Sequence, residues 1–294
     1  MRADRRFLGW GKAFWANVRT ISQELGYTAR RSGQVRVYSV AEMAAAMTGA
    51  GLGVSHLTGP KGTTELGEIL RVYFEYRADV LNTYVEPRLM DVDAAKSLFE
   101  GLKSRLNPKC PIPLNKQKGE KAGPNLLTGI VNMLVEAGTE ALPVDYDPRE
   151  LTTFTKDGAP LRTLARRVDG CFPSAVNPIA VWEIKEYYYT TTFGSRVADG
   201  VYETLLDGLE LEELREHEGI NAEHVLIVDS HYTWWECGRS YLCRMIDMLN
   251  MGYVDEILFG REVTERLPDM AADWAKKLRA RGEGLPSPAG RGAT

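Results

Sequence analysis

The chain has 294 residues, 44 % of them hydrophobic, and a net charge of −4, so it is long enough to bury a sizeable core. It has no run of about eighteen apolar residues, which argues against a membrane span, and its acidic balance argues against a protein that binds nucleic acid through overall positive charge alone. Its four cysteines lack C-x-x-C spacing and no signal-peptide pattern is present, so reduced thiols and a cytoplasmic location are expected.

The first hundred residues are predicted to be mainly helical. Apolar residues at helical spacing predict an amphipathic helix over residues 5–25, and Ser39 is expected to cap a short helix through Met47. A longer pattern over residues 65–86 ends at Pro87, and a further helix is predicted over 92–104. One short extended piece is expected at residues 35–38.

A proline-rich stretch that begins at residue 107 and continues as a polar loop to residue 124 is predicted to be a linker. It would separate a helical N-terminal region, residues 1–106, from a catalytic region, residues 125–280. The N-terminal region would serve target recognition or dimerisation. Residues 281–294 are rich in glycine and proline without apolar periodicity, which predicts a disordered tail.

The second region alternates predicted strands and helices. A buried helix starts near Asn125, an apolar strand covers residues 179–185, a helix follows in which apolar residues repeat every four positions from Val197, and another strand covers 225–228. A helix over residues 241–249 ends at Gly252, and a short last strand covers 257–259. The expected fold class is therefore α/β.

The candidate chemistry lies in Asp169 and in the run Val181-Trp182-Glu183-Ile184-Lys185, with thirteen residues between Asp169 and Glu183. In a strand, Glu183 and Lys185 project to one face, whereas Trp182 and Ile184 project to the other. A Glu-x-Lys tripeptide alone is common and is typical of a solvated strand edge. Its apolar setting, and the aspartate at hairpin distance, favour a functional site.

Asp169 falls in a predicted strand–turn–strand that leads into the strand at residues 179–185, so the element order is strand, strand, helix, strand. With this order, the three residues resemble the signature of PD-(D/E)xK nucleases, the fold of many type II restriction endonucleases. The resemblance covers roughly residues 125–260, and Val168 stands where the signature name has proline. It implies a central mixed sheet flanked by helices and a divalent-metal-dependent cleavage of DNA.

The resemblance also implies roles for individual residues. Asp169, Glu183 and Lys185 would be catalytic, and Asp169, Glu183 and the Ile184 backbone carbonyl would hold Mg²⁺, for which Mn²⁺ could substitute. Glu136, on the helix that follows Asn125, is a candidate extra metal ligand, although an ordinary surface glutamate is the simpler interpretation.

Contacts with DNA are expected from basic or polar residues around this centre. The candidates are Arg166, Arg167, Ser195, Arg196, Lys116 and Lys118. For Ser195 and Arg196 a solvated helix start is at least as good an interpretation, and each basic cluster is more often a solvated surface than a DNA contact. The sequence His231 to Trp235 is read either as a DNA-contacting loop or as an aromatic packing cluster.

The leading hypothesis is a Mg²⁺-dependent type II restriction endonuclease that cuts double-stranded DNA as a homodimer. One alternative keeps the fold but assigns a repair, resolvase or phage-defence nuclease that acts on structured or modified DNA. Another assigns a non-catalytic DNA-binding module of the same fold. The presence of all three signature residues favours an enzyme over this last alternative.

Overall fold

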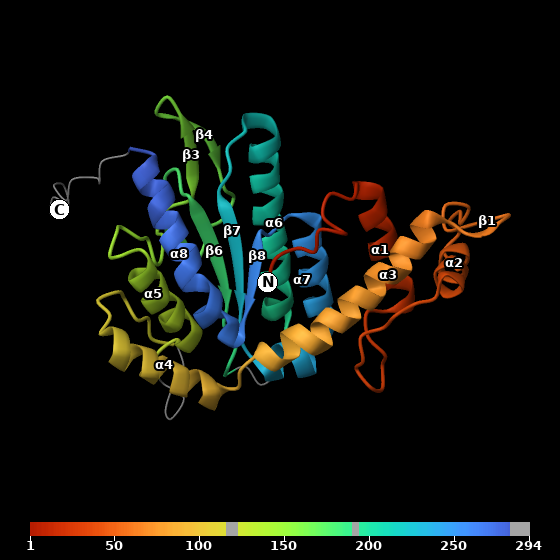
Figure 1. Cartoon of the computed structure of the whole chain (residues 1–294), viewed down its shortest axis with the longest axis horizontal. Helices are drawn as coiled ribbons and strands as arrows, with labels where there is room; N and C mark the ends of the chain where they lie inside the picture. Colours follow the sequence, from red (N-terminus) through yellow and green to blue (C-terminus); the bar gives the residue numbers. More distant parts are fainter. Residues whose placement is uncertain (116–122, 190–193, 283–294) are drawn as a thin grey trace.

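The computed structural model covers the whole chain and describes residues 1–115, 123–189 and 194–282 (Figure 1). Its α-helices are α1 Lys12–Leu25, α2 Val40–Gly49, α3 Glu65–Val80, α4 Val92–Leu106, α5 Leu126–Gly138, α6 Ser195–Glu218, α7 Arg239–Met251 and α8 Val263–Ala280. Its strands are β1 Thr58–Gly59, β2 Gly62–Thr63, β3 Thr153–Lys156, β4 Ala159–Thr163, β5 Gly170–Phe172, β6 Ala180–Lys185, β7 Glu223–Val228 and β8 Glu256–Phe259.

The central sheet has the strand order β5-β6-β7-β8. Strands β5 and β6 pair antiparallel as a hairpin, and β6, β7 and β8 run parallel. The helix α6 makes the crossover from β6 to β7, and α7 makes the crossover from β7 to β8. These pairings confirm the expected α/β class with a mixed central sheet flanked by helices. A helical N-terminal region precedes this sheet in the chain.

The two faces of the sheet are covered by different helices (Figure 1). Trp182, Val225 and Ile227 face α5 and α8, where the ring of Trp182 stacks on that of Trp274 at 5.7 Å between centroids. Leu226 and other alternate residues of β7 and β8 face α7 and the first half of α6. Because β6 is central and covered on both faces, any polar side chain on it is removed from water.

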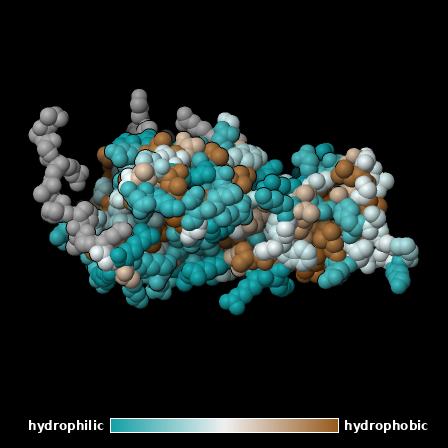
Figure 2. Space-filling view, turned by 90° about the horizontal axis from the view of Figure 1, so that it is seen from above, coloured by the Kyte–Doolittle hydropathy of each residue, from teal (hydrophilic) through white to brown (hydrophobic). Residues whose placement is uncertain are grey.

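The N-terminal helices α1 to α3 form a lobe that projects from the core (Figure 2). Ser39 caps α2 in a capping box with Glu42, as the sequence predicted for the start of this helix. The lobe is joined to the core by a buried ion pair, in which Nη1 of Arg77 lies 3.1 Å from Oδ2 of Asp247 and the Tyr73 hydroxyl donates to Oδ1 of Asp247. This contact fixes α3 against α7.

Most of the predicted helices and strands are confirmed, with differences near both ends and in the middle of the chain. Helix α1 begins at Lys12, later than residue 5, and residues 35–38 contribute an isolated bridge from Val35 to Thr28 where a strand was expected. The β3–β4 hairpin and α8 were not predicted. Residues 116–122 of the predicted linker and 283–294 of the predicted tail lie outside the described residues. In the described part, no helix combines the length and apolar composition that a membrane span requires.

Gly170 is expected to be essential for the packing of the site-bearing hairpin, because a Cβ atom there would lie 2.2 Å from Cε2 of Trp182. We expect Gly170→Ala to lower the free energy of unfolding by roughly 1–3 kcal/mol through overpacking. Gly101 in α4 has no such neighbour within 4 Å, so Gly101→Ala is a matched control that should stabilise by about 0.5–1 kcal/mol. Urea unfolding measures both, and equal effects of the two substitutions would contradict the packing argument.

Candidate active site

The hairpin β5–β6 brings Asp169 beside Glu183. Gly170 pairs with Trp182, so Asp169, one residue before β5, continues alongside β6. Its N–H donates to the Trp182 carbonyl at 3.1 Å, and its Oδ2 accepts the Ile184 N–H at 2.7 Å. These two contacts flank Glu183, and they orient the Asp169 carboxyl towards the same end of β6.

Glu183 and Lys185 lie on one face of β6, as their alternation predicted. Glu183 is fully buried and Lys185 is 4 % exposed. The ammonium of Lys185 donates to Oε2 of Glu183 at 2.8 Å and lies 3.6 Å from Glu203 of α6. A buried carboxylate and a buried ammonium thus neutralise one another inside the protein.

Helix α6 supplies two further carboxyl groups, those of Glu203 and Asp207. The helix approaches β6 closely because Gly200 has no side chain: a Cβ there would lie 3.3 Å from Cδ of Lys185. One and two turns further on, Glu203 reaches solvent while Asp207 is fully buried. The sequence pattern did not identify either residue as part of the site.

Arg166 contacts three of these acids, Glu183, Glu203 and Asp207. Its Nη1 lies 2.9 Å from Oε1 of Glu183 and 2.6 Å from Oδ2 of Asp207, and its Nη2 lies 3.4 Å from Oε2 of Glu203. The Oε1 atom of Glu183 is buried, and its contact with Arg166 does not have good hydrogen-bond geometry. The Oδ1 atom of Asp207 is also buried and has no hydrogen-bond partner among the described residues. The guanidinium of Arg166 thus lies within a carboxyl cluster formed by Asp169, Glu183, Glu203 and Asp207. Its predicted contact with DNA stays a prediction.

The charges of the cluster shift the pKa values of its members. Burial alone would raise the pKa of Glu183, but Lys185 and then Arg166 outweigh burial and lower it. Burial and then Glu183 raise the pKa of Asp207 to about 7. Four carboxyl groups therefore face two cations, and shifted pKa values of this kind gather at functional sites.

Asp169 lies at the open side of the cluster. Its side chain reaches solvent. Because its inner side faces protein, partial burial and then the charge of Glu183 raise the pKa of Asp169 to about 6. Asp169 and Glu203 are thus the two exposed carboxyl groups of the cluster, whereas Glu183 and Asp207 are buried.

The donor set fits Mg²⁺ in its chemistry. Among the residues that the structure describes, no three His, Cys, Asp or Glu side chains converge as a metal cluster. Mg²⁺ keeps several waters and needs only one or two carboxylates, which Asp169 and Glu183 could provide. The Ile184 carbonyl points to the same strand edge as its N–H, and so towards Asp169. A metal ion on Oε1 of Glu183 would have to displace or share the contact of this atom with Nη1 of Arg166, which lies at 2.9 Å.

Glu136 is not brought to this cluster. It lies on α5, which packs on the opposite face of the sheet, and its Oε2 accepts the backbone N–H of Lys109 at 2.9 Å. Among the described residues, no contact joins Glu136 to Asp169 or Glu183. Its assignment as a metal ligand stays a prediction without support from the geometry.

The remaining predicted DNA contacts lie around the site or outside the described residues. Arg167 is exposed, and Ser195 is the exposed first residue of α6. Arg196 follows in the same helix turn. Lys116 and Lys118 lie outside the described residues. The assignment of these residues to DNA stays a prediction.

Of the aromatic residues after β7, the two tryptophans belong to the hydrophobic core, whereas Tyr232 is 47 % exposed. Trp234 and Trp235 are buried, and the Trp234 indole donates to Oδ1 of Asp229 at 2.9 Å and contacts the ring of Tyr187. Asp229 also accepts the Tyr187 N–H. These contacts connect the end of β7 to the end of β6, beside Lys185.

A family model described as Domain of unknown function (DUF7687) matches residues 90–274, more than half of the chain. The chain belongs to this family. A second model, Domain of unknown function (DUF7690), matches residues 1–84. No curated protein and no solved structure matches the chain.

The two matched segments meet near the irregular turns that follow α3, whereas the sequence placed a boundary at residues 107–124. The DUF7687 segment contains α4 to α7, the central sheet and most of α8, and α4 shares one hydrophobic cluster with α5. Every residue of the carboxyl cluster lies within the DUF7687 segment. The chemistry of the site is therefore a property to test in this family.

Arg166 is expected to stabilise the folded state, because its removal leaves the buried acids Glu183 and Asp207 with too little positive charge. We expect Arg166→Gln to lower the free energy of unfolding by roughly 2–4 kcal/mol. Arg162→Gln is the matched control: Arg162 pairs with Glu213 at 2.5 Å on the surface, and its loss should cost less than about 1 kcal/mol. Equal losses in urea unfolding would contradict the role assigned to Arg166.

Asp229 predicts a specific dependence of stability on pH. It is fully buried, and burial raises its pKa to about 8, whereas an unfolded aspartate titrates near 4. Between about pH 4 and about pH 8, Asp229 is protonated in the folded state and ionised in the unfolded state. The stabilisation is therefore complete below about pH 4 and is lost as pH rises to about 8, by at most about 1.4 kcal/mol per pH unit.

Asp229→Asn removes this titration and keeps an oxygen acceptor. Between pH 5 and pH 8.5, wild type should lose more free energy of unfolding than the variant. Parallel profiles for the two proteins in urea unfolding would mean that Asp229 does not carry a raised pKa.

Proposed function

We propose that this protein is a divalent-metal-dependent nuclease with a restriction-endonuclease-like core, which hydrolyses phosphodiester bonds of double-stranded DNA in the cytoplasm as a homodimer. The observation that carries the proposal is the position of Asp169, Glu183 and Lys185 at one end of β6. The element order β5, β6, α6, β7 around them matches the order on which the resemblance rests. All four cysteines are free thiols, as expected in a reducing compartment.

Mg²⁺ or Mn²⁺ would be held by Asp169, Glu183 and the Ile184 carbonyl, and when bound it supplies an electrophile for the phosphate and lowers the pKa of a coordinated water. Lys185 keeps its proton, because the charge of Glu183 outweighs the effect of burial and raises the pKa of Lys185. As a fixed cation it can orient the attacking water and stabilise the charge that develops on the phosphate.

Arg166 would add a second fixed cation. Its side chain is 23 % exposed while its guanidinium contacts the buried acids, so Arg166 lies between these acids and the surface. A guanidinium binds phosphate through two parallel hydrogen bonds. Arg166 would thus hold the substrate phosphate at the open side of the cluster, next to Asp169.

A non-catalytic role of the same fold is the alternative that one observation favours. Glu183 already has both Lys185 and Arg166 as partners, and a buried ion-pair network of this kind can be purely structural. The alternative predicts no cleavage under any metal condition. The two functions therefore differ in a single measurable outcome.

The test is incubation of plasmid and phage DNA with the full chain in Mg²⁺, in Mn²⁺ and in EDTA. We expect cleavage only with metal, and a loss of roughly 100-fold or more in rate for Asp169→Asn, Glu183→Gln and Lys185→Met. Glu213→Gln is the matched control, because Glu213 lies on α6 beyond Asp207 and pairs with Arg162 at the surface. It should cleave as wild type does.

Unfolding midpoints of all variants would separate lost chemistry from lost folding. Defined fragments from unmodified duplex support restriction, whereas cuts confined to junctions, single strands or modified DNA support a repair, resolvase or phage-defence nuclease. Absence of cleavage by folded wild-type protein in both metals contradicts the nuclease proposal, and so does undiminished cleavage by all three site variants.

A further inference from the structure

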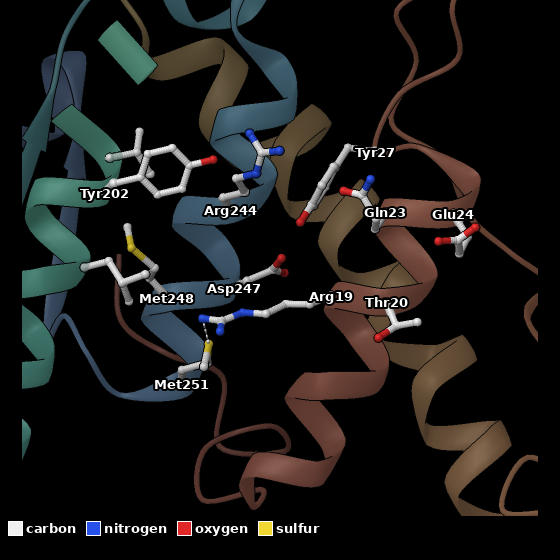
Figure 3. Close-up of a pocket in the computed structure, with 12 residues that line it drawn as sticks. Arg19, Thr20, Gln23, Glu24, Tyr27, Tyr202, Arg244, Asp247, Met248 and Met251 are labelled. Atoms are coloured by element: carbon white, nitrogen blue, oxygen red, sulfur yellow. Dashed lines mark hydrogen bonds between the residues drawn. The ribbon is translucent and has the colours of Figure 1, made fainter. Parts of the chain in front are cut away.

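A cavity of about 560 Å³ lies between the N-terminal lobe and the core (Figure 3). One wall is α1, from the DUF7690 segment, and the other walls are α6 and α7, from the DUF7687 segment. Small-molecule sites in proteins have volumes of about 300–1,000 Å³ and favour such junctions. The cavity is thus of a suitable size for a small ligand.

Two arginines face this cavity without a carboxylate partner. Among the described residues, neither Arg19 nor Arg244 lies in an ion pair. Arg244 is held in place by two tyrosine rings, at 4.8 Å from the centroid of Tyr27 and 4.5 Å from that of Tyr241. Arg19 reaches across from α1 to the sulfur of Met251, a weak acceptor, at 3.5 Å. Both guanidinium groups keep hydrogen-bond donors for an anion.

The acids of the cavity do not neutralise these arginines. Asp247 is already bound by the buried Arg77 and by the Tyr73 hydroxyl, neither of which lines the cavity. Glu24 is exposed, and in Figure 3 it lies beyond Gln23, away from Tyr202. Arg19 and Arg244 are therefore cationic groups of the lining that no described carboxylate pairs with.

The rest of the lining is apolar and aromatic. Tyr202 is 49 % exposed and stands on the opposite side of the cavity from Tyr27 (Figure 3). Val201, Leu205 and Met248 line the cavity beside it. An exposed tyrosine next to aliphatic and methionine side chains offers a flat surface on which a planar ring can stack.

The cavity is separate from the carboxyl cluster. Gly200, Glu203 and Asp207 lie on the face of α6 that points to β6, and Val201, Tyr202 and Leu205 lie on the opposite face because a helix turns 100° per residue. A DNA strand at Asp169 would therefore not run on into the cavity along this helix, which favours a separate small ligand.

We propose that this cavity binds a nucleoside phosphate, with its phosphate on Arg19 and Arg244 and its planar base against Tyr202. The ligand would contact both family segments at once. The inference does not rest on the nuclease proposal, since none of its residues belongs to the carboxyl cluster.

The test is titration calorimetry of the full chain in EDTA, which prevents metal-dependent hydrolysis. The probes are the four ribonucleoside monophosphates and triphosphates, inorganic phosphate and an eight-nucleotide single-stranded DNA. We expect at least one nucleotide to bind saturably. Arg19→Gln and Arg244→Gln should each weaken its binding by about tenfold or more, and Tyr202→Ala by about fivefold or more.

Arg71→Gln is the matched control, because Arg71 lies on α3 outside the cavity and pairs with Glu68 at 2.6 Å. It should bind as wild type does. Arg19 and Tyr202 are exposed, so their variants are expected to fold, and unfolding midpoints check this.

Four outcomes would overturn the proposal. They are the absence of saturable nucleotide binding up to millimolar concentration, unchanged binding by the cavity variants, binding of inorganic phosphate alone, and tighter binding of the DNA oligonucleotide than of every mononucleotide. The last would instead make the cavity part of a nucleic-acid path.

Discussion

The buried carboxylate of Glu183 is the constraint on which the rest of the structure depends. Burial of a carboxylate without water or a partner costs several kcal/mol of folding free energy, so the fold must supply a compensating positive charge. Lys185 supplies it from the same strand and Arg166 from the segment that precedes the hairpin. Because Arg166 also binds Asp207, one charge holds together strand β6, helix α6 and the approach to β5.

Helix α6 is the element that serves two purposes. Its face towards β6 carries the polar residues of the cluster, and close approach to neighbouring elements is possible at its glycines: a Cβ at Gly208 would lie 2.4 Å from the Tyr253 carbonyl oxygen. Its other face lines the cavity next to α1. A shift of α6 would therefore change both the cavity and the carboxyl cluster. The helix is thus a physical connection between the proposed ligand and this cluster.

The sequence predicted the parts of the site that depend on local periodicity. Alternation along one strand places Glu183 and Lys185 on the same face, and that relation survives any arrangement of the other elements. Asp207 could not be found in this way, because on a helix an acid near other acids has the pattern of a solvated face. Only the packing of α6 against β6, permitted by Gly200, converts Asp207 into a buried member of the cluster.

The difference between local periodicity and tertiary packing also explains why the β3–β4 hairpin and helix α8 were not predicted. The β3–β4 hairpin has short, largely exposed strands without a clear apolar alternation, although Asp157-Gly158, both with positive φ, is a typical hairpin turn and was the available signal. Helix α8 contains Pro268, which suggests an interruption, yet Trp274 and its neighbours bury one full face against α5. Tertiary burial here outweighs local propensity.

The ion pairs of the cluster and its proposed metal are in competition, and this competition follows from the charges. A divalent cation on Glu183 would repel Arg166 and weaken its 2.9 Å contact. Arg166 would not be left without a partner, because Asp207 lies on the same nitrogen and Glu203 on the other. The two carboxyls of α6 thus provide an alternative site for the guanidinium, which lowers the cost of admitting a cation next to Asp169. Asp207, which is buried and shares one guanidinium nitrogen with Glu183, is the nearer of these two alternatives, and the exposed Glu203 is the more distant one.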